Sequence, residues 1–263
     1  MNKDLIYVYC ITGNPPQHDQ VEELWDLKYI GVDGFYATIK YVSESEFSEE
    51  NLKKNLSDIS WVETNAREHI KVISRIMENS TVIPFKFGTI YNSEEGLRKF
   101  IRDYSSSLSK NLKSIEGKEE WSVKIYCNYK TLIENTEELS EDVVAIEKQI
   151  GESSPGKAYI LQRKKDEVIK GEIEKLYKFY SQQFFDELKS LSESYLINNL
   201  LPKELTEKID DMILNVTFFV SKNKVRDFIS TTELQMNKNK IYGVTVEATG
   251  PWPPFSFISI NEK

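Results

Sequence analysis

Apolar and polar residues follow two periods along the first half of the chain, and each period predicts one kind of element. Short runs of β-branched and aromatic residues predict strands at 5–11, 34–42, 81–91 and 121–127. Between residues 60 and 79 the apolar positions recur every three or four residues, which is the spacing of one face of an α-helix. Ser93, followed by two glutamates, predicts the start of a further helix that runs to Leu112.

The second half of the chain carries an unusually long helical pattern. Apolar positions step by three or four residues over 158–200, and Pro202 is expected to end the helix. This helix would span roughly 60 Å at about 1.5 Å per residue, so we expect it to project from its domain or to break near 189–194. The acidic segment 131–152 before it is expected to form a solvated helix or insert that ends in a loop.

The order of the elements predicts an α+β fold. Strand, helix and strand follow one another at 82–127 and again at 213–249, and this order is typical of split βαβ units. The two stretches share too little sequence to indicate a duplication. We therefore expect two α+β domains, with the boundary between residues 115 and 130.

Composition narrows the class of protein. The 263 residues include 13 Phe, 14 Tyr and 4 Trp, and this amount of bulky apolar surface excludes a disordered chain. A net charge of −8 argues against general affinity for nucleic acids or anionic membranes. No signal peptide is recognisable, and no apolar run approaches the ~20 residues needed to cross a bilayer. A soluble, cytoplasmic protein is expected.

Candidate catalytic and metal-binding residues are few. The two cysteines, Cys10 and Cys127, lie far apart, and the only histidines are His18 and His69, so we expect no metal site. The GxSxG motif is absent, and paired carboxylates are consecutive in sequence and point to different sides of a helix. His69 lies on the apolar side of its predicted helix and is interpreted as a core-edge histidine with a hydrogen-bond partner. We expect no catalytic residue and no cofactor.

The segment 151–158 resembles a phosphate-binding loop and leaves one alternative open. Its sequence, Gly-Glu-Ser-Ser-Pro-Gly-Lys-Ala, has the glycines and the lysine of GxxxxGK[ST], but Ala158 stands where the motif has a hydroxyl that binds Mg²⁺. Such a loop also follows a buried strand, whereas an acidic segment precedes this one. A turn before a helix is the preferred interpretation, and a nucleotide-binding enzyme or regulatory module is the alternative.

Two segments are unusual enough to be candidate interaction sites. Pro84 and Gly88 interrupt the strand predicted over 82–90, which favours an edge strand or a bulge in which Gly88 accepts no side chain. Three prolines in the segment 249–257 exclude a regular helix. They predict an extended aromatic tail that packs across the C-terminal sheet or the domain interface, or that docks on a partner.

These segments carry a resemblance to a known family. The matching pieces are Tyr7-Val-Tyr9, Val82-Ile-Pro-Phe-Lys-Phe-Gly-Thr89, Glu120-Trp-Ser-Val-Lys124, Gly156-Lys-Ala-Tyr159 and Thr249-Gly-Pro-Trp-Pro-Pro-Phe-Ser-Phe257. Over nearly the whole chain they resemble the gas vesicle protein F/L family, and the strand at Trp121 with the intact Gly-Pro-Trp-Pro-Pro favours the L branch. Phe255 stands where the family usually has Tyr, and Lys86 where many members have Arg.

The resemblance implies a non-enzymatic accessory protein of gas vesicle formation. It implies a ferredoxin-like α+β domain over 1–118 and a C-terminal α+β domain over 119–263, which contains the acidic segment and the long helix. The implied partners are the small hydrophobic shell protein and other accessory proteins, in the cytoplasm and at the gas vesicle. The interaction candidates are Pro84, Phe85, Lys86, Phe87, Gly88, Trp121, Gly250, Pro251, Trp252, Pro253, Pro254 and Phe255.

Overall fold

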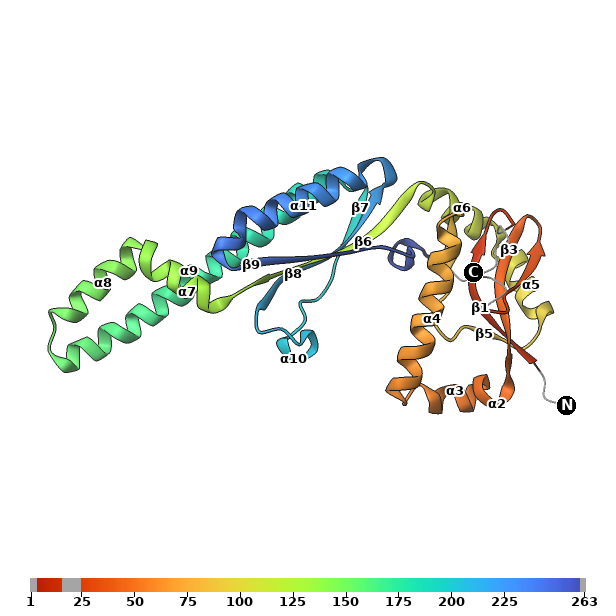
Figure 1. The fold of residues 1–263 in the computed structure, drawn as a ribbon, viewed down its shortest axis with the longest axis horizontal. Helices are drawn as coiled ribbons and strands as arrows, with labels where there is room; N and C mark the ends of the chain where they lie inside the picture. The colour runs from red at the N-terminus through yellow and green to blue at the C-terminus, as the bar shows by residue number, and fades with distance from the viewer. Residues whose placement is uncertain (1–3, 16–24, 261–263) are drawn as a thin grey trace. The chain divides into compact units, whose positions relative to one another are not determined.

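The computed structural model describes residues 4–15 and 25–260, which form two compact units (Figure 1). The N-terminal unit holds the described residues up to Glu120 together with 251–260, and the C-terminal unit is Trp121–Gly250. Two sheets with helices between their strands confirm the α+β class. Residues 251–260 pack with the N-terminal unit, whereas the expected C-terminal domain over 119–263 included them.

The N-terminal unit contains one sheet and five helices among its described residues. Its strands are β1 (Asp4–Thr12), β2 (Lys28–Val32), β3 (Phe35–Ser43), β4 (Val82–Pro84) and β5 (Ile90–Tyr91). Its helices are α2 (Glu44–Phe47), α3 (Glu49–Asn55), α4 (Ile59–Met77), α5 (Glu94–Asp103) and α6 (Ser105–Ile115). The last two replace the single helix expected over 94–112, because the chain bends at Tyr104.

The N-terminal sheet has the strand order β2–β3–β1–β4, which is the order of a ferredoxin-like split βαβ sheet. β1 lies in the middle and is buried from Leu5 to Thr12. This explains its continuous apolar sequence, since a strand covered on both faces has no polar side. The pairing of β1 with β3 shifts between Val8 and Cys10, so Tyr9 is the extra residue of a β-bulge. A bulge re-aims side chains, and here it redirects Tyr9.

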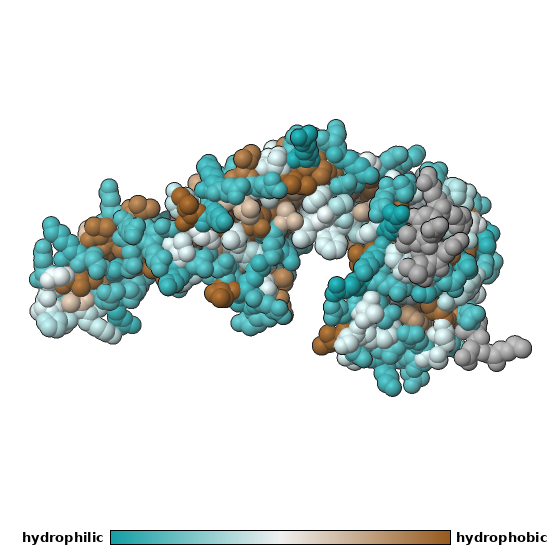
Figure 2. All heavy atoms as spheres, in the orientation of Figure 1, coloured by the Kyte–Doolittle hydropathy of each residue, from teal (hydrophilic) through white to brown (hydrophobic). Residues whose placement is uncertain are grey.

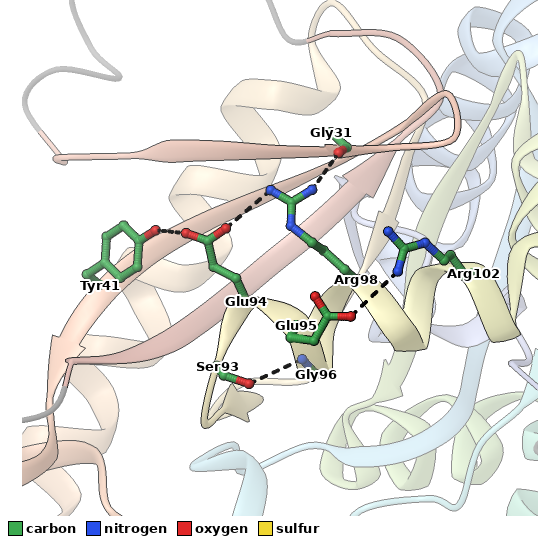
Figure 3. A network of polar contacts seen from close by, with 8 residues as sticks. All are labelled: Gly31, Tyr41, Ser93, Glu94, Glu95, Gly96, Arg98 and Arg102. Atoms are coloured by element: carbon green, nitrogen blue, oxygen red, sulfur yellow. Dashed lines mark hydrogen bonds and ion pairs between the residues drawn. The ribbon is translucent and has the colours of Figure 1, made fainter.

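A polar network attaches α5 to this sheet (Figure 3). Arg98 donates hydrogen bonds to the carbonyl of Gly31 in β2 at 3.0 Å and to the Glu94 carboxylate at 3.2 Å. The Tyr41 hydroxyl in β3 donates to the other oxygen of Glu94 at 2.5 Å. The network fixes the first two turns of α5 against β2 and β3.

The C-terminal unit contains a second sheet and a set of longer helices. Its strands are β6 (Lys118–Cys127), whose first residues lie in the N-terminal unit, β7 (Ser194–Ile197), β8 (Asp211–Ser221) and β9 (Val244–Trp252), which ends beyond Gly250. Its helices are α7 (Tyr129–Leu139), α8 (Glu141–Gly151), α9 (Pro155–Ser190), α10 (Lys203–Thr206) and α11 (Val225–Asn239). The acidic segment expected over 131–152 thus forms α7 and α8.

The second sheet has the order β7–β8–β6–β9, so the strands of both sheets follow the same order along the chain. Helices α9 and α11 run beside each other along this sheet (Figure 1). Helices α7 and α8 pack against the N-terminal half of α9. The expected strand–helix–strand unit over 82–127 is wrong, because β6 belongs to the second sheet. The order that repeats along the chain is that of the four strands β1 to β4 in the first sheet and β6 to β9 in the second.

The long helix is shorter than the expected 158–200. α9 ends at Ser190, inside the stretch where a break was expected, and the strand β7 follows before Pro202. Tyr195 keeps the helical spacing in sequence but contacts α9 from β7, with its ring 4.9 Å from that of Phe185. Serines at this point of the chain favour the break, because they are weak helix formers.

A buried lysine joins the helices α7, α8 and α9 of the C-terminal unit. The side chain of Lys165 in α9 is 10% exposed. Its ammonium lies 2.9 Å from the carboxylate of Glu137 in α7 and also pairs with Glu147 in α8. The two acidic helices are therefore held to α9 by opposite charge as well as by apolar contacts.

Candidate interaction site around the two sequence motifs

The Pro-Phe-Lys-Phe-Gly segment forms a loop between two short strands that both pair with β1. Pro84 at the end of β4 pairs with Cys10, and β5 begins at Ile90. The amide and the hydroxyl of Thr89 donate to the Lys86 carbonyl at 3.1 and 2.7 Å, which closes a four-residue turn. Gly88 is its third residue with a φ of 78°, as a type II turn requires.

The structure confirms that Gly88 has a positive φ, but the expectation that the position has no room for a side chain is wrong. A Cβ there would lie 3.6 Å from the side chain of Leu52, which is ordinary contact distance. Space is therefore available, and the positive φ is what favours glycine.

Three hydrogen bonds hold this loop to β1 and α4, and His69 in α4 makes two of them. Its Nε2 lies 2.9 Å from the carbonyl oxygen of Phe85, and its Nδ1 lies 2.8 Å from the hydroxyl of Tyr7. The Gly88 amide donates to the same hydroxyl at 3.3 Å. A carbonyl only accepts, so Nε2 carries the proton and Nδ1 accepts from Tyr7. Burial lowers the pKa of His69 and favours the neutral ring. The hydrogen-bond partner expected for this histidine is present.

Aromatic rings surround His69 and bring the two motifs together. Tyr9, redirected by the bulge, stacks on the imidazole with centroids 5.5 Å apart, and Phe87 of the loop meets it edge-on at 5.9 Å. Phe255 stacks on it at 6.5 Å. The loop after β4 and the C-terminal motif, which lie far apart in sequence, therefore meet at one side chain of α4.

Polar contacts anchor the C-terminal segment to the N-terminal unit. The amide and the hydroxyl of Ser256 donate to the two oxygens of the Glu120 carboxylate at 2.9 and 2.8 Å. Asn111 in α6 donates to the carbonyl of Ser259 at 2.9 Å. Burial raises the pKa of Glu120, and the two bonds from Ser256 oppose this rise. The tail was expected to lie extended across the C-terminal sheet or the domain interface. The part of this expectation that names the C-terminal sheet is wrong, because these partners belong to the N-terminal unit, and Phe255–Phe257 forms a 3₁₀ turn.

The interaction candidates divide between buried and exposed positions. The buried candidates are Pro84, Phe85, Pro253 and Pro254, and the half-buried ones are Phe87, Gly88 and Phe255. The exposed candidates are Lys86, Gly250, Pro251 and Trp252. Trp121 is buried in the core of the C-terminal unit, on β6, which pairs with β9. No pattern in the sequence indicated that Glu120 anchors the tail, because the whole of the C-terminal unit separates Glu120 from Ser256 along the chain.

The structural setting of segment 151–158 differs from that of a phosphate-binding loop. Gly151 ends α8 and Pro155 begins α9, so the segment joins two helices and does not follow a strand. Within 4–15 and 25–260, no group of three His, Cys, Asp or Glu side chains is arranged to hold a metal ion. No helix in these ranges is both long enough and apolar enough to cross a membrane.

Comparisons with known proteins give matches across both units. Gas vesicle protein L of Streptomyces sp. is 23% identical over 222 residues, covering 84% of this chain and 79% of that protein. Gas vesicle protein F1 of Halobacterium salinarum is 24% identical over 211 residues, covering 78% and 74%. Relatives named L and F thus match at similar identity.

Solved structures show the same fold. The crystal structure of GvpF from Anabaena sp. has a TM-score of 0.70 at 19% identity and covers 98% of this chain and 100% of that one. The GvpF structure from Microcystis aeruginosa has a TM-score of 0.62 at 17% identity, covering 97% and 98%. Residues 5–259 match the family described as gas vesicle synthesis protein GvpL/GvpF, and this match spans both motifs. The chain therefore belongs to the GvpL/GvpF family of gas vesicle synthesis proteins.

Proposed function

We propose that this chain is a non-enzymatic accessory protein of gas vesicle formation, which binds the hydrophobic shell protein as an assembly factor or minor shell component. The observation that carries the proposal is the family match over residues 5–259, which includes both structural units. Other accessory proteins of the same system are further partners. The protein would act in the cytoplasm and at the gas vesicle.

The C-terminal unit offers a surface suited to such a partner. β7 is an edge strand of its sheet, with Leu196 and Ile197 43% and 66% exposed. Further along the chain, Leu205 and Ile209 are 70% and 86% exposed. Figure 2 shows small apolar patches of this kind separated by hydrophilic surface. A sheet edge flanked by apolar side chains readily pairs with a strand of another chain, so we place the shell protein here.

Co-expression with the shell protein tests this placement. The double variant Leu196→Lys, Ile197→Lys should reduce the shell protein that co-purifies with the tagged chain at least tenfold, because charge on an edge strand opposes pairing. The control Leu234→Lys, in α11 and 68% exposed, should leave capture unchanged. Unchanged capture by the double variant contradicts the edge as the binding surface. No capture by the unmodified chain contradicts the proposed function.

Nucleotide binding at 151–158 has a separate test. A site of about 10 μM would add roughly 2.7 kcal/mol of stability at millimolar ATP and Mg²⁺. We expect the melting temperature to stay unchanged. A rise that disappears in Lys157→Ala would support the nucleotide-binding alternative instead.

A further inference from the structure

A pocket of about 260 Å³ lies beside the loop of residues 85–89 between β4 and β5, here called the motif loop, and it is wholly within the N-terminal unit. It opens between β1, β3, α2 and α4, and Phe87 of the loop forms part of its wall. Sites for small molecules usually measure ~300–1,000 Å³. This pocket is smaller, so its size fits one side chain of a partner better than a cofactor.

Aromatic rings form the buried wall of the pocket. Tyr7, Tyr9 and Phe47 line it and are 4%, 3% and 8% exposed. The bulge in β1 places Tyr9 beside Tyr7, with ring centroids 4.8 Å apart, and Phe47 meets Tyr7 edge-on at 5.8 Å. The faces of aromatic rings carry partial negative charge and attract cations.

Charged residues in the pocket also favour a cation. Glu46 and Glu68 line it together with one basic residue, Lys40, whose ammonium lies 3.1 Å from Glu68. Glu46 accepts a hydrogen bond from the indole Nε1 of Trp61 at 2.9 Å. That donor is neutral, and among the described side chains no Lys or Arg lies within ion-pair distance of Glu46. The pocket thus has one carboxylate more than it has cations.

We propose that this pocket receives the guanidinium group of an arginine side chain carried by a protein partner. A guanidinium stacks on ring faces and donates two parallel hydrogen bonds to one carboxylate, whereas an ammonium is a compact, strongly hydrated charge. The arginine plane lies against the rings, and its N–H groups reach Glu46. That the arginine belongs to a protein of the gas vesicle system rests on the proposed function; the binding chemistry does not.

The indole N–H of Trp61 reports directly on occupancy of the pocket. The full chain, labelled with ¹⁵N, is titrated with Nα-acetyl-arginine amide, and the four tryptophan indole signals are followed by NMR. We expect the Trp61 signal to move with millimolar affinity, because the ligand competes for its acceptor. Nα-acetyl-citrulline amide, a neutral analogue of the same shape, should give at least a tenfold weaker response.

Matched variants separate this site from general attraction to an acidic protein. Glu46→Gln keeps an oxygen that can accept from Trp61 but removes the charge, and it should weaken the arginine response at least tenfold. Glu49→Gln, in α3 and outside the pocket, removes an equal charge and should leave the response unchanged. Unchanged signals from the other indoles verify that each variant is folded.

Three results overturn the proposal. These are no movement of the Trp61 signal, equal movement with citrulline, and equal loss of the response in both variants. A larger response to Nα-acetyl-lysine amide overturns the choice of guanidinium. The capture of shell protein in the co-expression test uses no arginine analogue, so failure of either proposal is distinguishable from failure of the other.

Discussion

Gly88 restricts the motif loop through its backbone. Its φ is 78°, and a Cβ would be 3.6 Å from Leu52, so a small side chain meets strain but no clash. Gly88→Ala should therefore lower the free energy of unfolding by ~1–2 kcal/mol, the cost of a left-handed conformation for an L-residue. Urea denaturation followed by circular dichroism measures this change.

Gly96 is the matched control for Gly88. It lies in the first turn of α5 with a negative φ, and a Cβ there would lie 3.6 Å from the Ser93 hydroxyl. Gly96→Ala should raise stability by up to about 1 kcal/mol, because alanine is the better helix former. If both substitutions destabilise equally, backbone strain at Gly88 is not the cause.

His69 makes the N-terminal unit sensitive to acid. Burial lowers its pKa in the folded state, so the unfolded chain binds the proton more readily. Stability is therefore complete above about pH 6.5, the usual value for histidine, and falls as the pH drops toward the folded pKa. His69→Gln should flatten the pH dependence of the free energy of unfolding below pH 6.5, although it lowers stability at pH 7.

Glu120 shifts stability in the opposite direction. Burial raises its folded pKa above the usual 4.5, so the folded state binds the proton more readily. Its contribution is present at low pH and is lost as the pH rises through the folded pKa. Relative to the unmodified chain, Glu120→Gln should therefore be more stable at pH 7 than at pH 4. The reverse trend would contradict a buried carboxylate at this position.

At the scale of elements, the C-terminal segment acts as part of the N-terminal unit. It brings Phe255 to His69 and Ser256 to Glu120. Truncation after Gly250 should lower the melting temperature of the isolated protein without any partner, because it exposes apolar rings and leaves Glu120 without its donors. Truncation after Ile260 keeps these contacts and should leave the melting temperature unchanged. If the shorter chain melts like the full chain but no longer captures shell protein, the segment serves binding alone.

Periodic patterns in the sequence predicted the helices and strands whose residue spacing follows from burial. They failed for segments whose structure or position depends on contacts with residues far away in sequence. The stripe of α4 and the apolar run of β1 were recognisable, because burial dictates their residue spacing. β7 was missed because it has only four residues and follows α9 with the same apolar spacing. The place of the C-terminal segment depends on Glu120, which is far away in sequence. The pocket also escaped prediction, because its walls come from four elements and a loop.

At the scale of the whole molecule, each unit carries one buried cysteine. Cys10 lies in the first unit and Cys127 in the second, and each is fully buried. Burial raises the pKa of both thiols to about 12, so neither forms an appreciable thiolate while its unit is folded. Alkylation in increasing urea, read by peptide mass spectrometry, should therefore give a separate unfolding midpoint for each unit.

The same experiment tests whether the units unfold independently. Gly88→Ala should move the midpoint of Cys10 labelling to lower urea and leave that of Cys127 in place. A joint shift of both midpoints would show that the units unfold as one cooperative body.

The path of the chain through the two units sets the order in which the protein can mature on the ribosome. The chain leaves the first unit at Glu120 and returns to it at Pro251. Synthesis of the intervening unit, at ~5–20 residues per second, takes on the order of ten seconds. During that interval the sheet and helices of the first unit have been translated, whereas Phe255, the partner of His69, and Ser256, the partner of Glu120, have not. The segment 251–260, which is translated after the C-terminal unit, therefore completes a unit whose other elements are translated before it.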